Sequence, residues 1–183
     1  MRRIQIIVNN GAGTGQAHRV WKETQRLLRG YKIKYEAHMT RYRGHATKLA
    51  EKISGRKGND PVYLLVVGGD GTINEVLNGI LDFDRARLGV IPTGSGNDFG
   101  RNMKLPKTPK ESLRQICACI RKDQSGLELR RIDLGQVRWE GCEKPRIFGI
   151  SAGLGLDALV CKKALNSRLK QVLNRFHLGK LTY

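Results

Sequence analysis

The chain is poor in the residues that mark several classes of protein. Its four cysteines form no C-x-x-C pair and its four histidines are scattered, which argues against a zinc site and for reduced thiols in a cytoplasmic setting. Aromatic residues make up 6% of the chain, and no zinc-finger or RNP-type motif occurs, so we do not expect nucleic acid as a partner. The apolar run after the basic start ends at Val8, too short for a signal peptide. No run reaches the roughly 18 apolar residues of a membrane span, so we expect a soluble or peripheral protein.

Acidic residues are also scarce. The chain has 16 Asp and Glu against 34 Lys and Arg, a formal net charge of +18. This excess attracts polyanions, which include nucleotides and an anionic membrane face. The features together favour a cytoplasmic location, with peripheral attachment at the inner membrane face as a further expectation.

Short apolar runs alternate with helical stripes over the first two thirds of the chain. Their spacing predicts strands at 4–8, 31–39, 62–67 and 88–91, and helices around 20–28, 45–53, 73–80 and 113–120. Such alternation indicates an α/β fold with a parallel sheet flanked by helices. After Ser125 and Gly126 the pattern changes, and 127–137 and 146–151 read as strands with a short polar link. We therefore expect an α/β domain over 1–126 and a β-rich second domain, ending in a basic helix, over 127–183.

Three glycine-rich stretches, 9–15, 68–72 and 92–99, follow predicted strands. In Gly68-Gly69-Asp70-Gly71-Thr72 the glycines let backbone N–H groups approach phosphate oxygens at a helix N-terminus. Asp70 can organise Mg²⁺ or accept a proton from an attacking hydroxyl. The alternative is a glycine-rich turn in which Asp70 binds nearby amides.

Helix capping offers a second explanation for several polar residues near these stretches. Thr72 and Glu75 have the T-x-x-E spacing of a capping box, which explains Glu75 without a ligand. Asn97 or Asp98 is placed to cap a following helix. No G-x-x-x-x-G-K-[ST] occurs, and the G-x-G-x-x-A at 153–158 lacks a later acidic residue, so a P-loop or dinucleotide fold is disfavoured.

The residues from Val67 to Gly79 resemble the GGDGT-x-N-E-V-x-N-G signature of the diacylglycerol kinase catalytic domain, which bacterial lipid kinases and sphingosine kinases share. The stretch 92–99 is similar to the family's P-x-G-[ST]-x-N-D-F, and 40–50 and 153–158 resemble two further segments. These matches follow the family order from about residue 4 to residue 160. GGDGT alone also suits NAD kinases, which lack the P-x-G-x-x-N-D-F element.

The resemblance implies an ATP- and Mg²⁺-dependent kinase that transfers the γ-phosphoryl group to the hydroxyl of diacylglycerol or a related lipid. Asp70 is then the expected catalytic residue and Mg²⁺ ligand. Glu75, Asn97 and Asp98 are second choices for the nucleotide, because capping explains them too. The full expected nucleotide-binding set is Asn9, Gly13, Thr40, Gly68, Gly69, Gly71, Thr72, Glu75, Gly94, Ser95, Asn97 and Asp98.

Two departures from the family pattern affect this expectation. Asn10 stands where the family usually has proline, and the family continues well beyond residue 183, with a further aspartate thought to act as general base. We therefore expect an incomplete form of the enzyme with little activity alone. Two alternatives are a non-catalytic nucleotide- or membrane-binding fragment and an NAD kinase-like enzyme. Unpaired strand edges would also favour a homo-oligomer.

An apolar stripe over 165–176 lies beside several lysines and arginines. This combination predicts salt-sensitive attachment to anionic lipid. The same stripe equally suits a face that packs between two domains.

Overall fold

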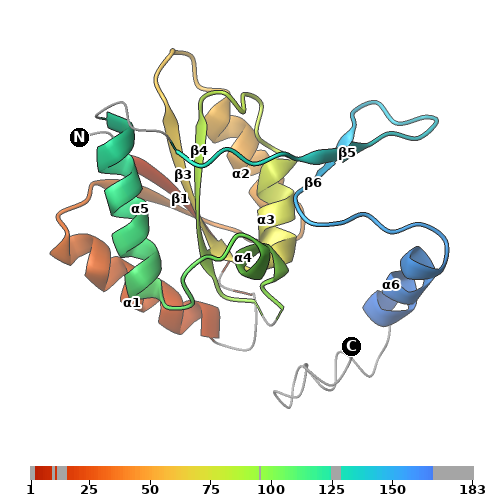
Figure 1. Cartoon of the computed structure of the whole chain (residues 1–183), viewed down its shortest axis with the longest axis horizontal. Coiled ribbons are helices and arrows are strands. Elements are labelled where there is room, and N and C mark those ends of the chain that lie inside the picture. Colours follow the sequence, from red (N-terminus) through yellow and green to blue (C-terminus); the bar gives the residue numbers. More distant parts are fainter. Residues whose placement is uncertain (1–2, 10, 12–15, 95, 125–128, 167–183) are drawn as a thin grey trace.

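The computed structural model of this protein describes residues 3–9, 11, 16–94, 96–124 and 129–166. Strands and helices alternate along the first 124 residues (Figure 1). The strands are β1 (Ile4–Val8), β2 (Tyr35–Met39), β3 (Val62–Gly68) and β4 (Ala86–Pro92). The helices are α1 (Gln16–Gly30), α2 (His45–Ser54), α3 (Asp70–Leu77), α4 (Asp98–Asn102) and α5 (Pro109–Gln124).

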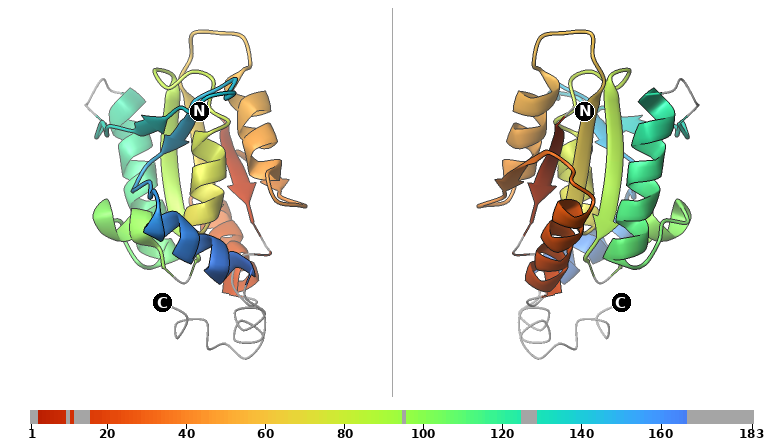
Figure 2. Two further views of the ribbon diagram at one scale, coloured as in Figure 1. Left: turned by 90° about the vertical axis from the view of Figure 1, so that its right-hand side faces the viewer. Right: turned by 90° about the vertical axis from the view of Figure 1, so that its left-hand side faces the viewer.

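The four strands form one parallel sheet in the order β2-β1-β3-β4. Strands β1 and β3 lie in the middle, and their apolar side chains are buried on both faces, as continuous apolar runs predict. Helices α1 and α5 cover one face, whereas α2 and α3 cover the other (Figure 2). The expected α/β fold, a parallel sheet flanked by helices, is thus confirmed.

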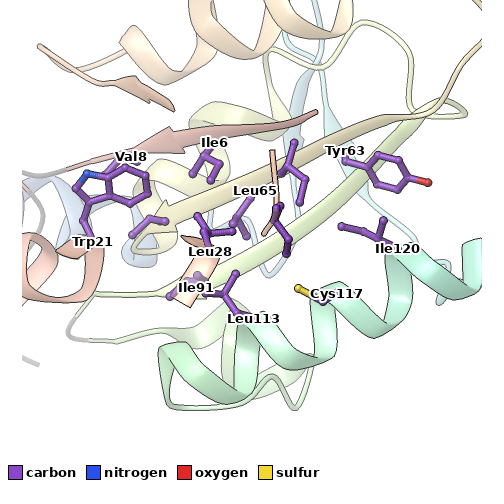
Figure 3. Close-up of a cluster of buried hydrophobic side chains, with 13 residues drawn as sticks. Ile6, Val8, Trp21, Leu28, Tyr63, Leu65, Ile91, Leu113, Cys117 and Ile120 are labelled. Atoms are coloured by element: carbon purple, nitrogen blue, oxygen red, sulfur yellow. The ribbon is translucent and has the colours of Figure 1, made fainter. Parts of the chain in front are cut away.

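The core on the α1 and α5 face joins both helices to the sheet (Figure 3). Ile6, Leu65 and Ile91 point to this face from three neighbouring strands, and Leu28 and Leu113 meet them from the two helices. Burying each such side chain contributes roughly 1.5–3 kcal/mol. Because this core fixes the strands side by side, it also fixes the positions of the loops that follow them.

Strand β2 differs from its prediction. The apolar alternation predicted a strand over 31–39, but β2 begins at Tyr35. Ile33 and Tyr35 pack against the core of the α1 face, whereas Ala37 is exposed and 38% of Met39 is accessible. As the edge strand of the sheet, β2 is covered only along its first half, which the alternation alone does not reveal.

The second region begins after α5 and contains a short antiparallel pair, β5 (Gly135–Val137) and β6 (Arg146–Phe148). The expected strands over 127–137 and 146–151 are correct in place but too long, since each true strand has three residues. Helix α6 (Leu156–Asn166) follows. Its side chains Leu156 and Val160 are exposed by 74% and 56%. Within the described residues, no helix combines the length and apolar character needed to cross a bilayer.

Candidate functional site

The glycine-rich loops continue the parallel ladder beyond the ends of the strands. The amide of Asn9 donates to Val67 O at 2.9 Å, and the amide of Thr40 donates to Val8 O at 2.9 Å. The amide of Thr93 donates to Gly68 O at 3.0 Å. These bonds place the segments after β2, β1, β3 and β4 next to one another at the carboxyl edge of the sheet, where ligands of open α/β folds bind.

Asn9 connects the first loop to the second. Its Nδ2 donates to Thr72 Oγ1 at 2.8 Å, and its Oδ1 accepts the amide of Gly11 at 3.1 Å. Thr72 is buried in the first turn of α3. The side chain of Asn9 therefore holds the loop after β1 against the Gly68–Thr72 segment.

The backbones of the second and third loops lie in close contact at Gly69 and Gly94. A Cβ added to Gly69 would lie 3.0 Å from Gly94 Cα, and one added to Gly94 would lie 2.9 Å from Gly69 Cα. A side chain at either position would push the two loops apart. A Cβ at Gly68 would lie 2.7 Å from Thr72 Cβ, so this position also requires glycine. Gly69 and Gly94 thus allow the two loops to approach closely, and Gly68 allows the turn into α3.

The carboxylate of Asp70 caps a helix in the third loop. Its Oδ2 accepts the amide of Asp98 at 3.1 Å, and its Oδ1 accepts the amide of Phe99 at 3.0 Å. Both amides belong to the first turn of α4, where backbone donors lack partners within the helix. Asp70 does bind amides, as the alternative from turn chemistry predicts, but these amides lie 28 and 29 residues away in sequence.

The predicted capping box is wrong. Helix α3 begins at Asp70 with Gly69 as its N-cap, and no side chain caps it. Glu75 instead reaches α2, where its Oε1 accepts the amide of Gly44 at 2.9 Å and its Oε2 accepts the amide of Ala46 at 3.2 Å. Glu75 is therefore a cap, but for the neighbouring helix.

The predicted cap of the helix after the third loop is also wrong. Asn97 occupies the N-cap position of α4 with φ of 51°, yet its side chain makes no cap bond. Its Oδ1 accepts the amide of Gly94 at 2.8 Å and closes the loop. Asp98 forms an ion pair with Arg101. The cap bonds come from Asp70.

These residues lie within the part of the chain that matches a known family. The model of the diacylglycerol kinase catalytic domain matches residues 3–136. This chain belongs to the diacylglycerol kinase catalytic domain family. The resemblance seen in the GGDGT and P-x-G-x-x-N-D-F stretches is thereby confirmed.

Individual relatives agree with this family. The chain is 34% identical to "Putative lipid kinase YtlR" of Bacillus subtilis, over 97% of this chain and 56% of that protein. It is 36% identical to a diacylglycerol kinase of the same organism, over 75% of this chain and 42% of that protein. The chain thus spans about half the length of the curated relatives it matches. A solved structure of a putative diacylglycerol kinase from Bacillus anthracis is similar to this chain, with a TM-score of 0.54 and 30% identity, over 63% of this chain and 39% of that one.

Two carboxylates lie near each other where the second and third loops meet. A Cβ added to Gly96 would lie 3.3 Å from Asp70 Oδ2 and 3.5 Å from Asp98 Oδ2, so both carboxylates border one small space. Mg²⁺ bound with nucleotides takes one or two protein carboxylates and completes its shell with phosphate oxygens and water. No cluster of three or more His, Cys, Asp or Glu side chains suited to a metal ion occurs in the described part of the chain.

Gly13, Gly71 and Ser95 are the remaining expected site residues, and the structure describes only Gly71. Gly71 is exposed, and nothing would lie within 4 Å of a Cβ added there. Gly13 and Ser95 fall outside the described residues, as do the side chains of the basic stripe at 165–176.

Sequence reasoning missed one buried polar residue beside the site. Thr93 is 2% exposed, and its Oγ1 finds no hydrogen-bond partner within the residues that the structure describes. No sequence signal marked this threonine, because it follows an apolar strand and resembles an ordinary loop residue.

Proposed function

We propose that this chain binds ATP together with Mg²⁺ at the carboxyl edge of its sheet, and that the protein phosphorylates the hydroxyl of diacylglycerol or a related lipid. The observation that carries the proposal is the contact between the Gly68–Thr72 and 92–99 stretches, where the carboxylates of Asp70 and Asp98 both lie near Gly96. Family membership supports the lipid substrate, since relatives are named diacylglycerol kinase.

The loops would bind phosphates through backbone amides. Helix α3 begins at this edge, directly after β3, and a helix N-terminus favours negative charge. The close contact of Gly69 with Gly94 keeps side chains away from the phosphates. We assign the nucleotide to Asn9, Gly13, Thr40, Gly68, Gly69, Gly71, Thr72, Gly94 and Ser95, with Glu75, Asn97 and Asp98 supporting the loops or the metal.

Asp70 would hold the metal in a fixed direction. Two backbone amides bind its carboxylate, so the group cannot rotate freely, and each oxygen retains a lone pair for Mg²⁺ or a proton. When bound, Mg²⁺ neutralises phosphate charge during phosphoryl transfer. The contribution of this chain is to position that charge and the donor phosphate.

Other parts of the assignment rest on sequence and charge. We place the boundary between a nucleotide-binding unit and a second unit at 126/127. We also propose a cytoplasmic protein, and the net charge of +18 supports contact with anionic membranes. The exposed apolar side chains of α6 support self-association of the isolated chain.

Calorimetry with ATP tests the proposal. We expect saturable binding that weakens when EDTA replaces Mg²⁺, and we expect Asp70→Asn to remove most of this metal dependence. Asp84→Asn, a change at an exposed acidic residue in the turn before β4, is the matched control and should behave like the wild type. Equal affinity with and without Mg²⁺ in all three proteins would disprove the role of Asp70.

A transfer assay tests the acceptor. Phosphate should pass from ATP to diacylglycerol in mixed micelles, and not to NAD, when the protein includes the region that its relatives contain beyond this chain. Transfer to NAD alone would overturn the lipid assignment.

A further inference from the structure

The loop between β2 and α2 presents an aromatic ring to solvent. The Tyr42 ring stacks on the His45 ring with centroids 4.6 Å apart and an interplanar angle of 17°. Lys48 Nζ lies 5.7 Å from the Tyr42 centroid. Despite these contacts, 54% of Tyr42 remains exposed. The loop therefore offers a partly open aromatic ring with a cation over it.

Hydrogen bonds around the loop fix this ring pair in place. The amide of Arg41 donates to His45 Nδ1 at 3.0 Å, and the amide of His45 donates to Tyr42 O at 3.1 Å. Because Nδ1 is an acceptor, the neutral His45 ring carries its hydrogen on Nε2. The backing ring thus has one defined orientation.

The carboxylate of Glu75, in α3, also fixes the conformation of this loop. Glu75 accepts the amides of Gly44 and Ala46, which flank His45. Gly44 has φ of +86°, a left-handed conformation that glycine adopts without strain. Glu75 of α3 therefore fixes the conformation of this loop. Because the loop is already ordered in the free protein, binding a flat ligand costs less conformational entropy.

The ring lies near the phosphate loops. Thr40, two residues before Tyr42, bonds to Val8 immediately before Asn9, and Asn9 bonds to Thr72 of the GGDGT loop. The rings and the phosphate amides thus belong to adjacent loops at one edge of the sheet. Arg41, Arg43 and Lys48 add positive charge on this side, with exposed side chains.

We propose that Tyr42, backed by His45, is the stacking platform for the purine base of a nucleoside triphosphate. The proposal rests on the proposed ATP site and adds the residue that selects an aromatic base. Every base has a π face, and stacking on an aromatic side chain strengthens binding about five- to hundredfold. A ring pair that serves only the packing of the loop would leave the affinity for a base unchanged.

Two ligands separate the base from the phosphates. ATP and inorganic tripolyphosphate, each with Mg²⁺, are titrated by calorimetry into the wild type, Tyr42→Ala and Tyr42→Phe. We expect Tyr42→Ala to weaken ATP binding about five- to hundredfold and to leave tripolyphosphate binding unchanged, whereas Tyr42→Phe should bind both like the wild type. Equal ATP affinity in the wild type and Tyr42→Ala overturns the platform and leaves the ATP site intact. Failure of the wild type to bind either ligand overturns the proposed function and the platform together.

Nuclear magnetic resonance gives a second readout that packing of the loop alone would not change. Stacking on a tyrosine ring shifts the adenine H2 and H8 resonances upfield. We expect this shift with the wild type and Tyr42→Phe and its loss with Tyr42→Ala, at ATP concentrations that saturate each protein. An undiminished shift with Tyr42→Ala would show that the base lies elsewhere. Circular dichroism of the three proteins checks that the exposed substitution leaves the fold unchanged.

Discussion

The α/β region up to residue 124 and the hairpin region from 129 to 166 gain their order from different sources. In the first, central strands are buried on both faces and helices pack on each side. In the second, the hairpin strands have three residues each and Leu154 is 85% exposed. The hairpin is bonded to Asn78 at the end of α3, and its Leu134 and Ile147 pack against the core on the α2 and α3 face. The first region therefore has its own buried core, whereas the second adds only a few side chains to that core.

A pair of leucine substitutions should give the largest contrast. Leu65 in β3 is 1% exposed, and its change to alanine removes packed methyl groups from the core. We expect Leu65→Ala to lower the free energy of unfolding by about 2–5 kcal/mol. Leu154→Ala removes the same atoms from an exposed site and should change it by less than about 0.5 kcal/mol. Urea unfolding measures both, and equal losses would mean that the second region is packed in solution.

The bond between the two regions gives the intermediate effect. Asn78 Oδ1 accepts the amide of Ile147 at 2.9 Å, and Asn78 Nδ2 donates to Ile147 O at 2.8 Å, so its side chain acts like a further strand beside β6. We expect Asn78→Ala to remove about 0.5–1.5 kcal/mol per bond, and to speed hydrogen exchange at the Ile147 amide far more than at core amides.

The exposed Asn102, at the end of α4, supplies the matched control. Asn102→Ala should leave exchange at Ile147 unchanged. If Asn78→Ala slows or preserves that exchange, another contact holds the hairpin.

Histidine titration should give the smallest effect, and only the first region should show it, because residues 129–166 contain no histidine. Burial lowers the pKa of His38 below its usual value of 6.5, against a smaller opposing effect of Glu36. The unfolded chain then takes up the proton at higher pH than the folded chain. This contribution to stability is complete above about pH 6.5 and is lost as the pH falls through the folded pKa.

Thermal unfolding between pH 7.5 and 5 measures this loss. His38→Gln keeps a donor for Gln5, which His38 contacts at 2.9 Å, and should flatten the decline in melting temperature. His18→Gln, at an exposed site, should leave the decline as in the wild type. A decline unchanged by His38→Gln would assign the pH dependence to other groups.

The difference between the two regions also explains how much of the structure can be predicted from the sequence. The apolar runs of β1 and β3 carry their own signal, because a strand buried on both faces needs such residues at every position. The GGDGT and P-x-G-x-x-N-D-F stretches likewise located the second and third loops. Local patterns therefore suffice for the layers and for the position of the candidate site.

Contacts between distant residues escaped prediction. The T-x-x-E spacing predicted that Glu75 caps its own helix, yet its carboxylate accepts the amides of Gly44 and Ala46 at the start of α2. Capping of α4 was expected from Asn97 or Asp98, and it comes from Asp70. In each case a local rule named the correct type of interaction and the wrong partner, because the partner depends on which loops the sheet brings together.

Helix α3, together with its C-cap residue Asn78, joins these distant contacts. Asp70 binds α4, Glu75 binds α2, and Asn78 binds the hairpin. A sequence change at one of these positions therefore alters the geometry of a second segment that it does not adjoin in the chain. A rotation of α3 about its axis would move the third loop, the Tyr42 ring pair and β6 together. A ligand that displaced this helix would therefore change the structure of both regions.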